Sequence, residues 1–322
     1  MTIRQIYNLA IETGIKADLR GEKEVRKNLK KINEKYNKLS KEKKERFDRE
    51  KLTNPFSDTR LLVGNPDKEV KRIMVGIDID TSELLMARYL ADQYERKIDL
   101  VLAHHPIGHA LADLSDVMHL QADILAQYGV PINIAEAVMR PRISEVARGV
   151  LPINHNKPVD AAKLLNLALI CIHTPADNLS ASFLNKVIKN KKPETLGEII
   201  KILREIPEYK EADKEKAGPK IFVGRADAKV GRIALTEITG GTDGAKEIYQ
   251  NMAQAGIGTV IGMHMKEEHR AEAEKAHVNV VIAGHISSDS LGMNLFLDEL
   301  ERKGIEIIPC SGLIRVKRFR NK

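Results

Sequence analysis

Three short apolar segments of this 322-residue chain each lead directly into histidine. The segments and the residues that follow them are 100–103 before His104-His105-Pro106, 169–172 before His173, and 280–283 before Gly284-His285. Runs of Val, Ile and Leu of this length are typical of buried strands, and ligands of α/β proteins gather beyond the carboxyl ends of such strands. The sequence therefore predicts that the three histidine groups meet at one site.

Two aspartates accompany these histidines. Asp177 follows His173 in the second group, and Asp289 lies four residues after His285, one turn further along if a helix begins there. Imidazole nitrogens and carboxylate oxygens without a neighbouring thiolate suit zinc, iron, manganese, cobalt or nickel. Three or four histidines and two aspartates exceed the ligands of one four-coordinate ion, so we expect two divalent metal ions bridged by a carboxylate.

The local sequence explains how adjacent histidines could face the same site. Neighbouring residues of a strand point in opposite directions, but Pro106 ends the strand and so permits His104 and His105 to turn toward one point. Gly284 allows an unusual backbone angle before His285. The alternative for any one of these histidines is a hydrogen-bonded residue at a strand end, and it is the combination of three groups that favours a metal site.

Other candidate residues carry less information. His264 follows the apolar run 258–263 without an aspartate close by in the sequence, so we expect it at most to support the site. The glycine-rich segment 239–244 could present backbone N–H groups to an anion at a helix N-terminus, but a tight turn from strand to helix is the favoured interpretation. Cys171 and Cys310 are the only cysteines, too few for a four-thiolate zinc site or a disulfide framework.

Alternating strand and helix patterns predict an α/β fold with largely parallel sheets. The strand candidates are 73–77, 98–103, 167–172, 232–238, 258–263 and 278–283. The helix candidates are 81–95, 115–128, 143–149, 180–190, 195–205, 243–255, 266–275 and 290–303. A charged stretch at 209–219 is expected to join two lobes, and we detect no internal repeat in the body of the chain.

The basic surplus of the chain belongs to its N-terminal segment. Residues 1–51 hold 16 basic and 9 acidic side chains, a surplus of seven that equals the net charge of the whole chain. Apolar residues over 25–39, at spacings of four and three, predict an amphipathic helix that packs on the body or on another subunit. The alternative is a basic arm for an acidic partner such as RNA, which no aromatic interleaving or RNA-binding motif supports.

Composition excludes several classes of protein. Hydrophobic residues make up 43% of the chain and charged residues 30%, which excludes a disordered protein. No run approaches the roughly 18 apolar residues of a membrane-spanning helix, and residues 1–9 lack the apolar core of a signal peptide. We therefore expect a cytoplasmic protein with no membrane partner.

The histidine groups and their order resemble the NIF-three-like family (NGG-one-interacting factor three), many of whose members are labelled GTP cyclohydrolase I type two-like. The matching segments are LVLAHHPIGH, IHTPADN, VVIAGHISSD, DTRLLVGNPDKEVKRIMVGIDID, ETLGEIIKIL and KVGRIALTEITGGTDG. The resemblance covers roughly residues 55–315.

The resemblance implies two linked α/β lobes with a dinuclear metal site in the cleft between them, and ring-shaped homo-oligomers, often hexamers. The expected divisions are a basic amphipathic helical extension at 1–52, a first lobe at 53–195 and a second lobe at 196–322. The metal ligands implied by the resemblance are His104, His105, Asp177, His285 and Asp289, with Asp177 as the bridging carboxylate. His173 matches a histidine beside the family's site, either a direct ligand or a neighbour of the ligands.

Three features depart from the family pattern. Asp289 stands where the family usually has Glu, and the shorter side chain could change the geometry or the preferred metal. Residues 131–160 form an insertion, which we expect to cover the cleft or to build a subunit contact. The basic N-terminal helix also lies outside the pattern.

These features predict a metal-dependent hydrolase in which a metal-bound water attacks a phosphoester, a nucleotide or a cyclic amide. His173 or a nearby carboxylate would move protons. The alternatives are a non-catalytic metal-binding or adaptor ring and, less favoured, a protein that binds nucleic acid through its basic N-terminal helix.

Overall fold

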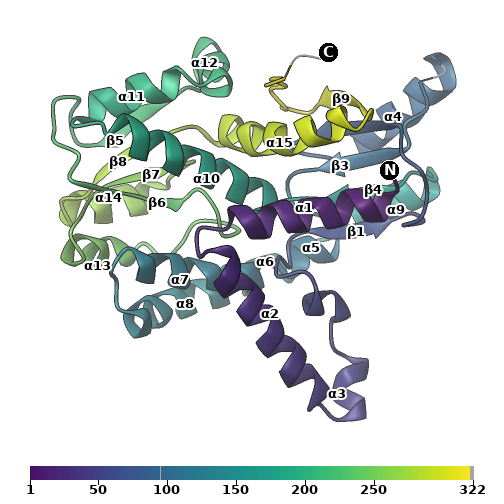
Figure 1. Ribbon diagram of the computed structural model, residues 1–322, viewed down its shortest axis with the longest axis horizontal. Coiled ribbons are helices and arrows are strands. Elements are labelled where there is room, and N and C mark those ends of the chain that lie inside the picture. The colour runs from purple at the N-terminus through teal and green to yellow at the C-terminus, as the bar shows by residue number, and fades with distance from the viewer. Residues whose placement is uncertain (95, 320–322) are drawn as a thin grey trace.

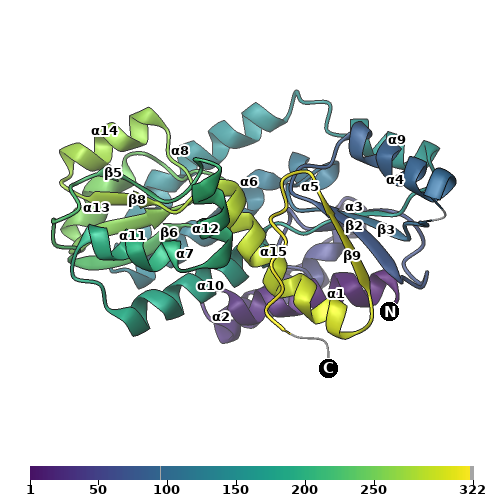
Figure 2. The same cartoon turned by 90° about the horizontal axis from the view of Figure 1, so that it is seen from above.

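The computed structural model describes residues 1–94 and 96–319, which form two α/β lobes and an N-terminal helical arm (Figures 1 and 2). The first sheet has the order β1 (Arg60–Val63), β4 (Leu169–Cys171), β3 (Leu100–Ala103), β2 (Arg72–Gly76) and β9 (Glu306–Cys310). The second has the order β5 (Lys220–Val223), β8 (Asn279–Ile282), β7 (Ile257–Gly262) and β6 (Arg232–Glu237). Only the pairs β1–β4 and β5–β8 among these are antiparallel, so the predicted α/β fold with largely parallel sheets is confirmed.

Helices cover both faces of each sheet. The first sheet packs against α1 (Ile3–Ala17) and α15 (His285–Arg302) on one face and against α4 (Thr81–Tyr94), α5 (His109–Ala112) and α9 (Lys157–Leu164) on the other. The second sheet packs against α10 (Thr174–Lys191), α11 (Leu196–Arg204) and α12 (Pro207–Lys214) on one face. Its other face packs against α7 (His119–Gln127), α8 (Ile132–Val150), α13 (Ile248–Gln254) and α14 (Glu267–Lys275), and α6 (Leu114–Val117) precedes α7.

Two long helices, α10 and α15, join the lobes. Ala176 of α10 and Met293 of α15 belong to the apolar core of the first lobe, whereas Leu184 and Leu291 of the same helices belong to a core of the second. Each helix begins almost directly after a strand, α10 after β4 and α15 after β8. The first turns of both helices therefore lie where the two lobes meet.

All six strand candidates correspond to strands, while β1, β5 and β9 were not predicted. Two of the missed strands are half-exposed: β5 alternates exposed and partly buried residues, and β9 has no fully buried residue. Such strands lack the continuous apolar run that marks a central parallel strand. The expected linker at 209–219 is largely helix α12, whose Tyr209 hydroxyl lies 2.9 Å from Ser288 Oγ of α15.

The two lobes repeat one another, contrary to the expectation of no internal repeat. The strands β1 and β5 carry the same irregularity in register and pair with the strands that precede α10 and α15. Matching residues recur 160 positions later: Val63-Gly64, Asp67, Val70 and Arg72-Ile73 as Val223-Gly224, Asp227, Val230 and Arg232-Ile233. The repeat is weak in the sequence because the matching residues are confined to the first two strands of each lobe and the turn between them. The later connections differ in length, as between β3 and β4 on one side and β7 and β8 on the other.

The chain passes between the lobes more often than the expected divisions suggest. Strand β9 lies in the first sheet, although it falls in the range 196–322 expected for the second lobe. Helices α7 and α8 cover the second sheet, although they fall in the range 53–195. Together with α13 and α14 they form the apolar core that contains Val260 and Val280. The insertion at 131–160 thus contributes α8 to the core of the second lobe.

The N-terminal arm is partly core and partly exposed. Ile3, Ile6 and Ala10 of α1 are fully buried against the first lobe, whereas α2 (Glu22–Asn37), the predicted amphipathic helix, projects away from the body with α3 (Lys41–Glu45) at its tip (Figure 1). A short 3-10 turn, Arg49–Leu52, returns the chain to β1. No helix within the described residues is long and apolar enough to cross a membrane.

Candidate metal centre

The predicted histidines and aspartates lie together where the lobes meet. His104 and His105 follow β3, while the remaining members of the cluster lie at the starts of α10 and α15. Gly284 has a φ of 115°, a conformation that glycine adopts without strain. It turns the chain from β8 into α15, so that the helix begins at His285, five residues before the predicted range 290–303.

His104 is buried between two carboxylates. Its Nε2 lies 3.4 Å from Asp177 Oδ1 and 3.5 Å from Asp289 Oδ1. Its Nδ1 lies 3.0 Å from the carbonyl oxygen of Ile172, which holds Nε2 toward the carboxylates. Burial would lower the pKa of His104, but the two carboxylates outweigh burial and raise the pKa to about 10. The position therefore favours positive charge, which a proton or a metal ion can supply.

His105 and His285 both face the other oxygen of Asp289. The Nε2 atoms of His105 and His285 lie 3.4 Å and 3.6 Å from Asp289 Oδ2. The other ring nitrogen of His105, Nδ1, lies 2.7 Å from Asp78 Oδ1, which orients the ring. Asp289 thus approaches three histidines. The resemblance implied the longer Glu at this position.

His173 is held by a buried carboxylate that the sequence analysis did not identify. Its Nδ1 lies 2.8 Å from Asp58 Oδ2, which also accepts a hydrogen bond of 2.6 Å from the Thr174 hydroxyl. Its Nε2 lies 3.8 Å from Asp177 Oδ2. The ring of His173 lies 4.9 Å from that of His104, centroid to centroid. Asp58 therefore directs Nε2 of His173 into the cluster.

The unpaired atoms of the cluster fit a metal site. Among the described residues, His104 Nε2, Asp177 Oδ1 and both carboxylate oxygens of Asp289 are buried without a hydrogen-bond partner. An unpaired buried polar atom costs about 1–3 kcal/mol, and more when it is charged. Three groups place their ligand atoms within 4.8 Å of one another: His104 with His105 and His173, His105 with His285 and Asp289, and His104 with Asp177 and Asp289. These residues could hold a metal ion.

The structure brings together all six residues singled out from the sequence, and it adds two carboxylates. Asp78 follows β2, and its position at the carboxyl end of a parallel strand is a signal that could have identified it. Asp58 precedes β1 and reaches His173 across 115 positions of the sequence. No spacing pattern in the sequence links these two residues.

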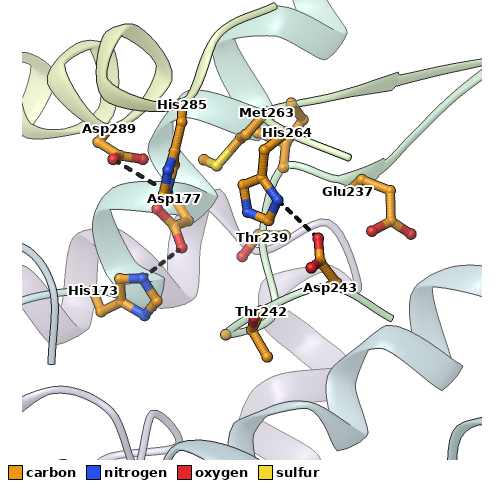
Figure 3. A pocket seen from close by; sticks show the side chains of 12 residues that line it. His173, Asp177, Glu237, Thr239, Thr242, Asp243, Met263, His264, His285 and Asp289 are labelled. Carbon is orange, nitrogen blue, oxygen red and sulfur yellow. Dashed lines mark ion pairs between the residues drawn. The ribbon is translucent and has the colours of Figure 1, made fainter. Parts of the chain in front are cut away.

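A small hollow with a volume of about 30 Å³ adjoins the cluster (Figure 3). On one wall, His264 Nδ1 lies 2.8 Å from Asp243 Oδ1, and the ring of His264 lies 4.6 Å from that of His285. His264 therefore has an aspartate partner after all, supplied by a different loop. It follows β7 as His105 follows β3, so both lobes place an aspartate-bound histidine after the corresponding strand.

The glycine-rich segment 239–244 forms a wall of this hollow rather than the start of a helix. Helix α13 begins only at Ile248. Gln121 Nε2 of α7 donates hydrogen bonds of 2.7 Å to the carbonyl oxygens of Gly240 and Thr242. Arg142 of α8 donates one of 3.1 Å to the carbonyl oxygen of Asp243. The favoured interpretation, a tight turn from strand to helix, is wrong, because residues 238–247 separate β6 from α13. Helix α8 helps to hold this longer connection.

Comparison with known proteins gives matches to solved structures. A NIF3 superfamily protein from Sphaerobacter thermophilus is 28% identical, with a TM-score of 0.72 over 80% of this chain and 92% of that chain. Reduced HcgD from Methanocaldococcus jannaschii is 17% identical, with a TM-score of 0.49 over 77% of this chain and 87% of that chain. A Bacillus cereus protein related to NIF3 is 11% identical, with a TM-score of 0.39 over 82% and 93%. No family model and no curated protein matches.

Proposed function

Since this chain belongs to the NIF3 superfamily, we propose that its histidine–aspartate cluster is the dinuclear metal centre of a hydrolase. The observation that carries the proposal is the set of buried, unpaired ligand atoms on His104, Asp177 and Asp289, which face one another across a few ångströms. A cluster maintained only for folding would pair these atoms with protein donors. A small hollow lined mainly by polar and charged side chains lies beside the cluster.

The ligand groups suggest how two divalent cations are held. His104 and Asp177 face one position, His105 and His285 face the other, and Asp289 belongs to both groups. We therefore propose Asp289 as the shared carboxylate, whereas the family resemblance implied Asp177. Histidine and carboxylate ligands leave zinc, iron, manganese, cobalt and nickel as candidates.

The protein's own groups prepare this site for hydrolysis. Divalent cations in such a site lower the pKa of bound water and polarise the bond to be cleaved. His173, fixed through Nδ1 by Asp58, presents Nε2 toward Asp177, where it can accept a proton and return it to the leaving group. The substrate classes open to this chemistry are a phosphoester, a nucleotide and a cyclic amide, and the GTP cyclohydrolase I type two-like activity implied by the resemblance is one case.

Elemental analysis of protein purified without chelator or nickel affinity resin tests the metal centre. We expect about two divalent metals per chain in the wild type, as a two-metal hydrolytic site requires. The near-isosteric variant Asp289→Asn is expected to lose most of this metal, and the exposed control His119→Ala none of it. Negligible metal in the wild type, with no uptake of added zinc, iron or manganese, would contradict the proposal.

Hydrolysis is then assayed on the metal-loaded wild type with one phosphoester, one nucleotide and one cyclic amide. If Asp289→Asn loses turnover in proportion to the metal it loses, the result supports the hydrolase. If the wild type binds metal but turns over none of the three substrates, the result would instead favour a non-catalytic metal-binding or adaptor protein.

A further inference from the structure

A cavity of about 520 Å³ lies along the free edge of β6. Strand β6 is the last strand of the second sheet, so one of its edges has no neighbouring strand. The carboxyl-terminal ends of α7 and α10 flank this edge (Figure 1). The cavity shares no lining residue with the hollow beside the histidine–aspartate cluster. A ligand bound in this cavity is therefore separate from the chemistry of the cluster.

The corresponding edge of the first sheet is occupied. Strand β2 is the counterpart of β6 in the repeat, and β9 pairs with β2 in parallel along that edge. The ends of α10 and α15 also correspond. Asp177 and Asp289 are separated by the same number of positions as Lys192 and Gly304, which both follow their helices with a left-handed backbone. After Gly304 the chain forms β9, whereas after Lys192 it turns into α11. The second lobe therefore lacks the strand that completes the first sheet.

The backbone along this edge can pair with an added strand. In the first lobe the Glu306 N–H donates a hydrogen bond of 2.8 Å to the carbonyl oxygen of Lys71. The counterpart of Lys71 in the repeat is Gly231, which lines the cavity. Further along β6, the Leu235 N–H points away from the sheet and donates to the Tyr128 hydroxyl at 3.2 Å. Tyr128 thus closes one end of the edge, and residues 231–233 remain as a template for another chain.

The cavity is basic. Among the described residues, no aspartate or glutamate lines it, and three cationic side chains do: Lys189, Lys192 and Arg232. None of the three forms an ion pair within residues 1–94 and 96–319. Arg232 is the counterpart of Arg72, whose Nε lies 2.7 Å from Glu306 Oε2 of β9. Arg232 has the Tyr128 carbonyl oxygen, at 3.0 Å, where Arg72 has a carboxylate. Charge complementarity therefore favours an acidic ligand with a carboxylate opposite Arg232.

We propose that the edge of β6 binds an extended acidic peptide of a partner protein, which adds a strand to the second sheet as β9 does to the first. Backbone hydrogen bonds to residues 231–233 hold the peptide, and its alternate side chains give specificity. A carboxylate of the peptide pairs with Arg232, and apolar side chains beside it contact Ile188 and Ile233 on the cavity wall. The proposal goes beyond the proposed hydrolase and does not depend on bound metal.

Fluorescence anisotropy with a labelled peptide tests the proposal. The probe has the sequence of residues 304–308, Gly-Ile-Glu-Ile-Ile, because β9 already pairs with the equivalent edge. We expect saturable binding to the wild type, and Arg232→Glu should weaken it about tenfold or more, because an attraction between charges becomes a repulsion. A second peptide, with Lys in place of its Glu, should bind the wild type more weakly than the probe does and bind the Arg232→Glu protein more tightly than the wild type. N-methylation of the Glu residue of the probe should also weaken binding, since it removes the N–H that donates to Gly231.

Arg225→Glu is the matched control, since it makes the same change at an exposed position of the second lobe outside the cavity and is expected to leave the affinity unchanged. Lys189→Glu, at an exposed position of α10, is expected to weaken the probe as well and replaces Arg232→Glu if that variant does not fold. The proposal is overturned if the wild type shows no binding at about 1 mM probe, or if the cavity variants bind the probe as the wild type does. Unchanged affinity after N-methylation would also overturn it, because binding would then rest on charge without an added strand.

Discussion

Asp58 orients one histidine of the histidine–aspartate cluster. The carboxylate is fully buried, and its Oδ2 is shared by the His173 ring and the Thr174 hydroxyl. Burial alone would raise the pKa of Asp58, but the bonds and charge from His173 and the bond from Thr174 lower it. Asp58 therefore stays ionised and fixes which nitrogen of His173 faces the cluster.

Replacing Asp58 with Asn is expected to weaken metal binding about 10–100-fold, the range found for carboxylates that orient a metal-site histidine. The reason is that an amide can stabilise the wrong tautomer of His173. Competition with a chromogenic chelator measures the affinity, and the melting temperature of the metal-free protein reports on folding. Asp67→Asn, at an exposed position paired only with Arg4, is the control. Equal affinities in both variants would refute the orienting role.

The raised pKa of Glu237 makes the stability of the protein depend on pH. The folded protein holds this proton up to a pKa of about 7, against an ordinary value of 4.5, so the unfolding free energy falls as pH rises between these two values. Glu237→Gln removes this loss, and we expect it to be about 1–3 kcal/mol more stable than the wild type at pH 8 and nearly equal at pH 4. Urea unfolding at both pH values measures the difference, and a gain of equal size at pH 4 would contradict the titration.

At the scale of secondary-structure elements, the crossing of α10 and α15 sets the distance between Asp177 and Asp289. The crossing is close because Gly292 of α15 has no side chain. A Cβ atom there would fall against the carbonyl oxygen of Ala176 and 2.7 Å from its carbonyl carbon. Backbone cannot yield as a flexible side chain does, so a larger residue must push the helices apart.

Gly292→Ala is therefore expected to lower the unfolding free energy by about 1–3 kcal/mol and to weaken metal binding, because the two aspartates separate. Gly149→Ala in α8 is the matched control, since a Cβ atom there meets nothing within 4 Å. That control should gain up to about 1 kcal/mol from helix propensity. Urea unfolding and chelator competition measure the two effects. A Gly292→Ala protein as stable as the Gly149→Ala protein would show that the crossing tolerates the methyl group.

For the whole molecule, the surface of α4 offers a place for the predicted homo-oligomer contact. Leu85 and Tyr89 lie one turn apart and are 53% and 56% exposed, and Leu164 of the neighbouring helix α9 is 88% exposed. Large apolar side chains that gather on one surface often mark an interface. The expected ring, and hexamers in particular, remain predictions from the family resemblance.

The double variant Leu85→Glu/Tyr89→Glu is expected to reduce the oligomer to smaller species, because two charges would be buried in the contact. Light scattering coupled to size-exclusion chromatography measures the mass of each species. Phe222→Glu, at a 41% exposed position of β5 in the other lobe, serves as the control. A monomeric wild type, or a double variant of unchanged mass, would contradict an interface on α4.

The sequence alone determined the elements that end in histidine. An apolar run followed by His104, His173 or His285 is local information, because the run forms a buried strand and the chain turns just beyond it. Parallel strands bring their carboxyl ends to a common edge, which accounts for His104 and His173 of the first sheet. His285 follows β8 of the second sheet, so it joins them only because the two lobes pack together. The six strands with continuous apolar runs were predicted for the same reason, while the half-exposed strands β5 and β9 were not.

Only the tertiary structure decided the partners of those residues. Asp58 reaches His173 across 115 positions, and Asp243 reaches His264 from a separate loop. The raised pKa of Glu237 likewise depends on its burial beside Asp243, a contact that no sequence pattern shows. Helices α7 and α8 likewise cover the second sheet although they precede it in the chain. Hydrogen bonds and packing depend on which surfaces meet, and local periodicity holds no information about contacts between distant segments.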